Sequence, residues 1–129
     1  MTPEETVDLL TVAAAFDQRT VGEGDAMAWY SVVGDLPFAD ARQAVLSYYA
    51  VTRERIMPAD VRTEVRRMRN ERIKEAGGVP APPAELLDDP EAYRAALRAA
   101  ATALADGRDP HEAMKAIARQ AVRLELEAS

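Results

Sequence analysis

Few side chains in this sequence are of the types that carry out covalent chemistry. His111 is the only histidine among 129 residues and cysteine is absent, which leaves no hydrolytic triad of the usual kind, no thiolate nucleophile and no disulfide. Metal binding would depend on carboxylates such as Glu4, Glu5 and Asp8, or the pair 88–89, but N-cap and helix-dipole roles explain these. His111 falls in the first turn of a predicted helix, a position typical of a solvated histidine. We expect no catalytic residue, no cofactor and no metal ion, and hence no enzyme.

A second candidate for a functional site is a set of arginines without acidic partners nearby in the sequence. Residues 53–75 carry eight basic and five acidic side chains, whereas residues 1–52 carry two basic and eight acidic ones. Arg62, Arg66 and Arg69 share one flank of a predicted helix, and none has an acidic neighbour three or four residues away. They could bind an acidic protein or nucleic-acid phosphates. Alternatively, they form a solvated flank or are neutralised by the acidic first half of the chain. The net charge of −6 favours weak or absent direct nucleic-acid binding.

The elements that position these residues are helical throughout. Apolar residues recur with helical spacing over residues 3–16, 21–33, 38–51 and 58–76, and no segment has the alternation of a strand. Because the connections are short, we expect these four helices to form a compact N-terminal domain, residues 1–76. Its predicted core residues are aromatic and aliphatic: Leu10, Phe16, Trp29, Phe38, Val45, Tyr48, Val61 and Val65.

Capping and breaking residues mark several of these boundaries. Thr2 and Glu5 have the spacing of a capping box at the start of the first helix. Gly34 follows the second helix and is placed to end it in the left-handed conformation. Gly77 and Gly78 are predicted to stop the fourth helix.

The composition changes after residue 76. Residues 77–89 are rich in glycine and proline and predict a hinge or linker. Two helices follow over 90–105 and 110–126 and predict a C-terminal αα-hairpin, residues 90–129. Its apolar stripes are mostly alanine, so the hairpin buries little area and needs the N-terminal bundle, a second copy or a partner's helices to pack on. Its candidate partner-binding residues are Tyr93, Leu97, Leu104, Met114, Ile117 and Leu124.

The sequence also bears on location. It contains no apolar run of about 18 residues, which a membrane-spanning helix needs. The N-terminus lacks the basic region that precedes the apolar stretch of a secretory signal. We therefore expect a cytoplasmic protein of the all-α class that does not bind membranes.

Several segments of the first 75 residues occur in a recognisable order. The first is an acidic amphipathic segment, Pro3–Leu10. Short apolar and aromatic motifs follow it: Ala28–Tyr30, Gly34–Phe38, Ala44–Val45, Tyr48–Tyr49 and Met57–Arg62. In this order and spacing the segment resembles the phage and prophage proteins of the replicative-helicase loader-and-inhibitor family. The resemblance covers slightly more than half of the chain.

The resemblance implies a helical N-terminal domain and a partner. Proteins of that family have no catalytic residues. They bind the ring-shaped replicative helicase, hold it inactive and help to deliver it to a replication origin through an origin-binding protein. For a phage-encoded protein, the implied location is the cytoplasm of the bacterial host.

The second half of the chain departs from that family, whose C-terminal half is flexible when free and makes the main helicase contact. Here the sequence predicts a capped helical hairpin, so the helicase contact is not transferred residue by residue. Two other functions stay open. One is a small DNA-binding regulator that uses the third and fourth helices and the three arginines, although the connection 52–57 is long for a helix-turn-helix. The other is a structural or assembly protein that associates with itself through residues 90–129.

Overall fold

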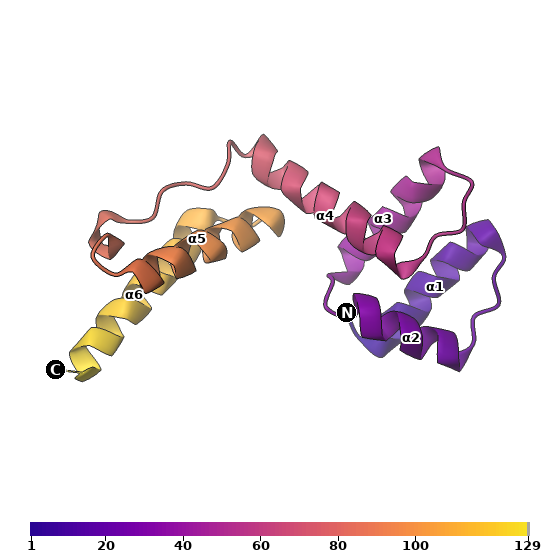
Figure 1. Cartoon of the computed structure of the whole chain (residues 1–129), viewed down its shortest axis with the longest axis horizontal. Helices are drawn as coiled ribbons and strands as arrows, with labels where there is room; N and C mark the ends of the chain where they lie inside the picture. Colours follow the sequence, from indigo (N-terminus) through magenta and orange to yellow (C-terminus); the bar gives the residue numbers. More distant parts are fainter. Residues whose placement is uncertain (129) are drawn as a thin grey trace. The chain divides into compact units, whose positions relative to one another are not determined.

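The computed structural model describes residues 1–128, and this part of the chain is all-helical (Figure 1). Six α-helices and one short 3₁₀ turn follow one another, and no strand occurs within residues 1–128. The elements are α1 (Pro3–Asp17), α2 (Glu23–Val33), α3 (Phe38–Val51), α4 (Pro58–Glu75), η1 (Ala84–Leu86), α5 (Pro90–Ala105) and α6 (Pro110–Ala128). The predicted all-α class is confirmed.

The chain divides into two compact units, and the boundary between them along the sequence falls inside α4. The first unit is Met1–Met68, and the second begins at Arg69. The last turns of α4 belong to the second unit. Within that unit, a guanidinium N–H of Arg72 donates to the backbone oxygen of Ala105 at 2.8 Å. The predicted linker, residues 77–89, therefore falls within the second unit and includes η1.

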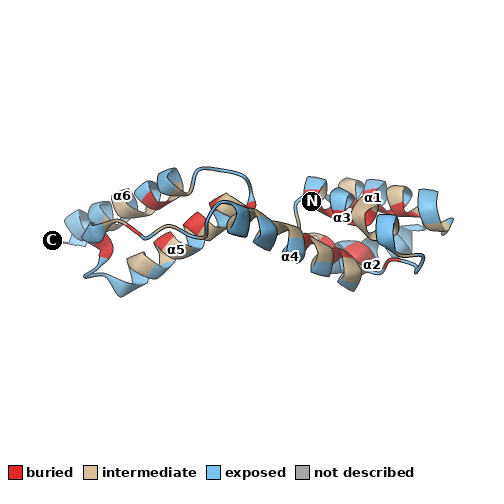
Figure 2. Cartoon of the chain, turned by 90° about the horizontal axis from the view of Figure 1, so that it is seen from above, coloured by how far each residue is buried: buried red, intermediate tan, exposed pale blue. Residues whose placement is uncertain are grey.

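The first unit has an aliphatic core with a single tryptophan. Helix α1 packs against α2 and α3, and the first half of α4 contributes Val61 and Val65, both fully buried. Figure 2 shows the buried residues of this unit on each of its helices. Among the predicted core residues, five are buried and two are partly buried against them: Leu10, Trp29, Val45, Val61 and Val65, with Phe38 and Tyr48.

The prediction that Phe16 is a core residue is wrong, because its side chain is 51% exposed. Helical spacing gives the reason. Leu10 and Ala13 are buried, and four residues beyond Ala13 the inward position is taken by Asp17, whose side chain is only 9% exposed. Phe16 instead lies at the edge of α1, where its ring stacks on Tyr49 with a centroid separation of 5.1 Å.

The predicted start of the first helix is confirmed. The Thr2 hydroxyl accepts from the Glu5 backbone N–H at 3.1 Å, and the Glu5 carboxylate accepts from the Thr2 N–H at 2.8 Å. This reciprocal pair satisfies two backbone donors that the first turn leaves free. The stop after α4 is also confirmed, since Gly77 and Gly78 have φ values of +90° and +93°.

Gly34 does not have the predicted left-handed conformation. Its φ and ψ are −60° and −23°, in the right-handed helical region. A Cβ atom at this position would lie 2.6 Å from the Tyr30 backbone oxygen and 2.9 Å from the Tyr30 ring. The glycine is therefore required by a close approach of Tyr30 and not by its own backbone angles.

The second unit has a small core made mainly of alanine. Helix α5 packs against α6 and η1. Leu86, Ala96, Ala100 and Met114 are buried together, and Figure 2 marks buried positions on the facing helices. Leu86 comes from η1, so the segment predicted as a linker supplies one of the two large buried side chains of this core.

Candidate functional site

The structure supplies partners for two of the three arginines that lack them locally. Arg62 donates from Nη1 to Oδ1 of Asp35 at 2.6 Å and to the Val32 backbone oxygen at 2.8 Å. Arg62 thereby holds the pKa of Asp35 below its usual value, chiefly through the hydrogen bond. Both residues are in the first unit, where the end of α2 meets the start of α4.

Arg69 is paired in the second unit. Its Nη1 lies 2.7 Å from Oδ1 of Asp106, and Arg108 reaches the other carboxylate oxygen at 3.0 Å. Burial alone would raise the pKa of Asp106, but hydrogen bonds from Arg108 and Arg69 outweigh it and hold the pKa below its usual value. Neutralisation by the acidic first half of the chain, one of the readings left open by the sequence, therefore applies to Arg62. Arg69 is also neutralised, but by a carboxylate of the second half, Asp106.

Arg66 differs from its two neighbours. It is exposed, and it forms no ion pair with any residue between 1 and 128. A phosphate-binding surface needs several uncompensated cations side by side. The flank of α4 that carries these three arginines has one uncompensated cation, Arg66, so it does not form a continuous basic surface.

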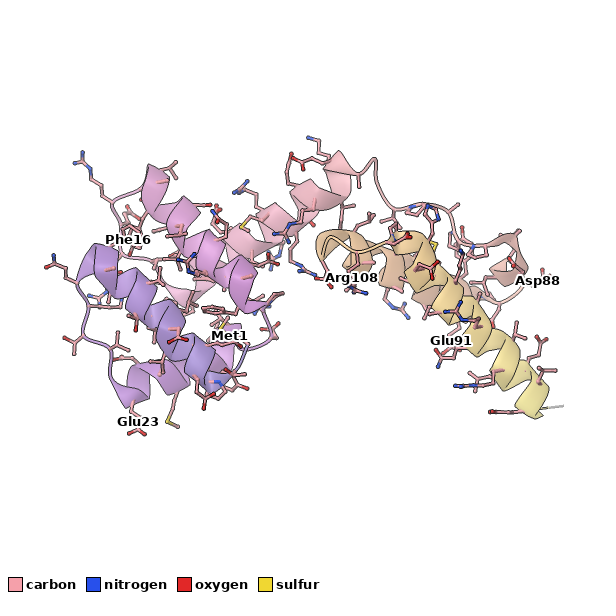
Figure 3. All side chains as sticks on the ribbon, turned by 180° about the vertical axis from the view of Figure 1, so that it is seen from behind. Met1, Phe16, Glu23, Asp88, Glu91 and Arg108 are labelled. Atoms are coloured by element: carbon pink, nitrogen blue, oxygen red, sulfur yellow. The ribbon has the colours of Figure 1, made fainter. Side chains whose placement is uncertain are left out.

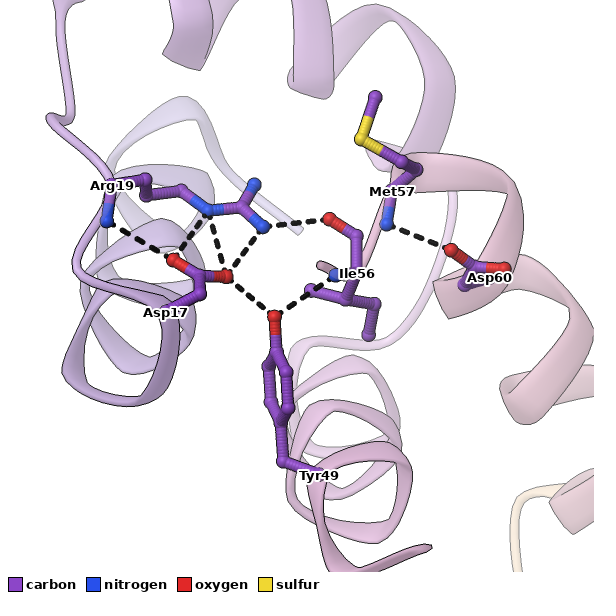
Figure 4. Close-up of polar contacts among 6 residues, drawn as sticks. All are labelled: Asp17, Arg19, Tyr49, Ile56, Met57 and Asp60. Atoms are coloured by element: carbon purple, nitrogen blue, oxygen red, sulfur yellow. Dashed lines mark hydrogen bonds and ion pairs between the residues drawn. The ribbon is translucent and has the colours of Figure 1, made fainter. Parts of the chain in front are cut away.

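A buried polar cluster that the sequence did not reveal joins the end of α1 to the loop before α4 (Figure 4). Arg19 forms an ion pair with Asp17 at 2.6 Å and donates to the Ile56 backbone oxygen at 2.7 Å. The Tyr49 hydroxyl donates to Asp17 at 2.5 Å and accepts from the Ile56 N–H at 2.9 Å. Arg19 and Asp17 are 5% and 9% exposed, and the Arg19 guanidinium lies 5.2 Å from the centre of the Trp29 ring.

The electrostatics of this cluster favour one fixed protonation state. The hydrogen bond from Arg19 is the largest effect on Asp17 and, against the opposing effect of burial, lowers its pKa to about 2. Burial, followed by the hydrogen bond to Asp17, raises the pKa of Tyr49. Near neutral pH the carboxylate is ionised and the phenol protonated. The cluster therefore holds the fully buried Ile56 and its loop in place; it is not poised to exchange protons.

The surface of the first unit has an apolar hollow between α1 and α2. Its volume is about 520 Å³, and its lining includes Val7, Met27 and Tyr30 with Glu4 and Glu23 at its edge. Sequence patterns did not single out this set, because the hollow exists only once the two helices pack. No basic residue lines it.

The candidate partner-binding residues of the C-terminal hairpin (residues 90–129) divide into three groups. Met114 is 2% exposed, and Tyr93 and Ile117 pack on the same core, so the hairpin itself buries these side chains. Leu97 and Leu104 are half-buried. Leu124 is 54% exposed and lies near the end of α6. Of the six, Leu124 is the one that offers an open apolar side chain.

Other chemistry is sparse in the described part of the chain. Within residues 1–128 no group of three or more histidine, aspartate or glutamate residues is arranged to hold a metal ion. His111 is exposed, and its backbone N–H donates to the Asp109 carboxylate at 2.9 Å as part of the start of α6. None of the helices described is long and apolar enough to cross a membrane. Comparison of the chain with protein families, curated proteins and solved structures finds no match.

Proposed function

We propose that the chain is a non-enzymatic replication adaptor that binds a hexameric replicative helicase and regulates or loads it. The observation that carries the proposal is the open apolar end of α6, where Leu124 is 54% exposed and Val122 and Leu126, four residues apart on the opposite face, are 53% and 70% exposed. Docking of an apolar helix on the helices of a partner is a common mode of protein recognition. The ordered motifs of the first 75 residues, which resemble the loader-and-inhibitor family, supply the identity of the partner.

The proposed division of labour follows the predicted layout. The four-helix domain predicted over residues 1–76 carries the motifs, and the helical arm (90–129) docks on the helicase. Residues 77–89, predicted as a hinge, stay with the arm, because Leu86 packs in its core. An origin-binding protein is the second partner that the resemblance implies. In this proposal the chain binds the helicase in the cytoplasm and uses no cofactor.

Co-purification tests this proposal. The full chain and a hexameric replicative helicase are mixed at micromolar concentrations with nucleotide present. We expect a stable complex that Leu124→Glu weakens. Leu87→Glu is the matched control, since Leu87 is 66% exposed and lies outside α6. Absence of binding by the unaltered chain would overturn the proposal, as would equal loss of binding in the two variants.

A DNA-binding function has one supporting observation: Arg66 is exposed and forms no ion pair within residues 1–128. If it were correct, duplex binding would be salt-dependent and Arg66→Glu would abolish it. Self-association has its own observation, since the open end of α6 could equally cover a second copy. Light scattering over a wide concentration range distinguishes this case, because a strict monomer excludes it.

A further inference from the structure

The hollow between α1 and α2 presents apolar side chains to solvent at a fixed site. Val7, Met27 and Tyr30 are 41%, 68% and 39% exposed, and all three line it. Pockets for small ligands bury about 70–90% of the ligand surface. The walls of this hollow are too open to enclose a small ligand in that way. The hollow therefore suits a larger partner, such as a helix that lays its apolar face against it.

Two features hold the aromatic side of the hollow in place. The Tyr30 ring lies against Gly34, where a Cβ atom would come within 2.9 Å of it. The Met1 amino group donates to the backbone oxygens of Gly34 and Leu36 at 2.7 and 2.9 Å, which joins the start of α1 to the end of α2. A contact residue that is ordered before binding loses less conformational entropy on association.

The charged side chains that line the hollow are both acidic. Glu4 and Glu23 are on its edge, and Figure 3 shows Glu23 projecting from the start of α2. Residues 1–52 carry eight acidic and two basic side chains. One of those two basic residues, Arg19, has a side chain that is 5% exposed and already paired with a carboxylate. Complementarity therefore favours a partner with positive charge beside its apolar face.

We propose that the α1–α2 hollow docks an amphipathic helix of a partner protein whose apolar face is flanked by lysine or arginine. Anchors spaced i, i+3 or i+4, and i+7 enter the hollow beside Val7, Met27 and Tyr30. The flanking cations lie near Glu4 and Glu23. This inference deepens the proposed function. It rests on that function only in taking the partner to be a protein. It adds a second contact surface, separate from the end of α6.

The test uses the ¹⁵N-labelled full chain and a designed helical peptide. The peptide has leucines at i, i+3, i+4 and i+7 with lysines on either side, and a second peptide has glutamate in place of lysine. We expect the lysine peptide to shift backbone resonances of α1 and α2, and Met27→Lys to weaken its binding at least about tenfold, the effect of losing one well-packed contact. Val51→Lys is the matched control, because Val51 is 87% exposed, lies outside the hollow and changes the net charge equally.

The outcomes separate this inference from the helicase proposal. Equal weakening by Met27→Lys and Val51→Lys would overturn the inference, as would shifts spread over both units or equal binding of the glutamate peptide. If the peptide occupies the hollow but no helicase binds the chain, the helicase proposal fails and the inference stands. If the helicase binds but the lysine peptide does not occupy the hollow, the inference fails alone. Tryptophan fluorescence of each variant, matched to the unaltered chain, verifies that the first unit is folded.

Discussion

Replacing Asp17 by asparagine should remove a defined part of the stability of the first unit. The pKa of this carboxyl falls from the ordinary 3.8 to about 2. One pKa unit corresponds to about 1.4 kcal/mol, so the ionised form contributes about 2 kcal/mol to folding. The variant also leaves Arg19 buried without its counter-charge, and breaking a buried pair in this way costs about 3–5 kcal/mol. We expect Asp17→Asn to lose about 3 kcal/mol at pH 6.

The pH dependence has a definite sign. Because the folded-state pKa lies below the unfolded value, the contribution of Asp17 is present in full above about pH 5 and is lost as pH falls through 4 toward 2. The stability difference between the unaltered chain and Asp17→Asn should therefore shrink by about 2 kcal/mol over that range. Other carboxylates titrate in both proteins, so the difference isolates Asp17.

Urea unfolding followed by tryptophan emission is the suitable assay. Trp29 is the only tryptophan, it is buried in the first unit, and the Arg19 guanidinium lies 5.2 Å from the centre of its ring. Its emission therefore reports on the unit that contains the substitution. If the stability of Asp17→Asn falls with pH in parallel with that of the unaltered chain, Asp17 has an ordinary pKa and the reasoning is refuted.

Three further substitutions, two of them paired with a control substitution, test other parts of the structure. In the same urea assay, Gly34→Ala should destabilise the first unit by about 1–3 kcal/mol through overpacking. Gly24→Ala is the control: because open space surrounds Gly24, this substitution should be neutral or should stabilise by up to about 1 kcal/mol. Met114→Ala removes a large buried side chain from the alanine-rich core and should cost about 2–5 kcal/mol; far-UV circular dichroism should record an earlier transition while tryptophan emission stays unchanged. Arg62→Glu should lower the tryptophan-detected stability by up to about 1 kcal/mol, since it removes a solvent-accessible ion pair, whereas Arg66→Glu should leave it unaltered.

Local signals predicted the helices well because they depend on neighbouring residues. The capping box of Thr2 and Glu5 and the stop at Gly77 and Gly78 were readable from the sequence and are present in the structure. Gly34 shows where such reading fails. A glycine after a helix is typical of a left-handed cap, but here the space is needed by the Tyr30 ring, and a contact of that kind is invisible in a residue pattern.

The candidate site was less predictable because its partners are distant in sequence. Arg62 and Asp35 are 27 residues apart, and Tyr49 and Asp17 are 32 apart. The spacing of charges along one helix correctly showed that Arg62 had no partner three or four residues away. It could not show which acidic residue of another element would approach, and it gave no hint that Asp17 would take the inward position expected for Phe16.

The alanine-rich core of the second unit has a thermal consequence. Ala96, Ala100 and Ala103 are fully buried but bring little apolar area from water, and alanine has no side-chain rotamers to lose on folding. The heat-capacity increment of unfolding scales with the apolar surface exposed. Calorimetry should therefore give the second unit a smaller increment than the first, whose core contains leucine, isoleucine, valine and tryptophan. A small increment means a shallow stability curve, so the arm should change little in stability between cold and physiological temperatures.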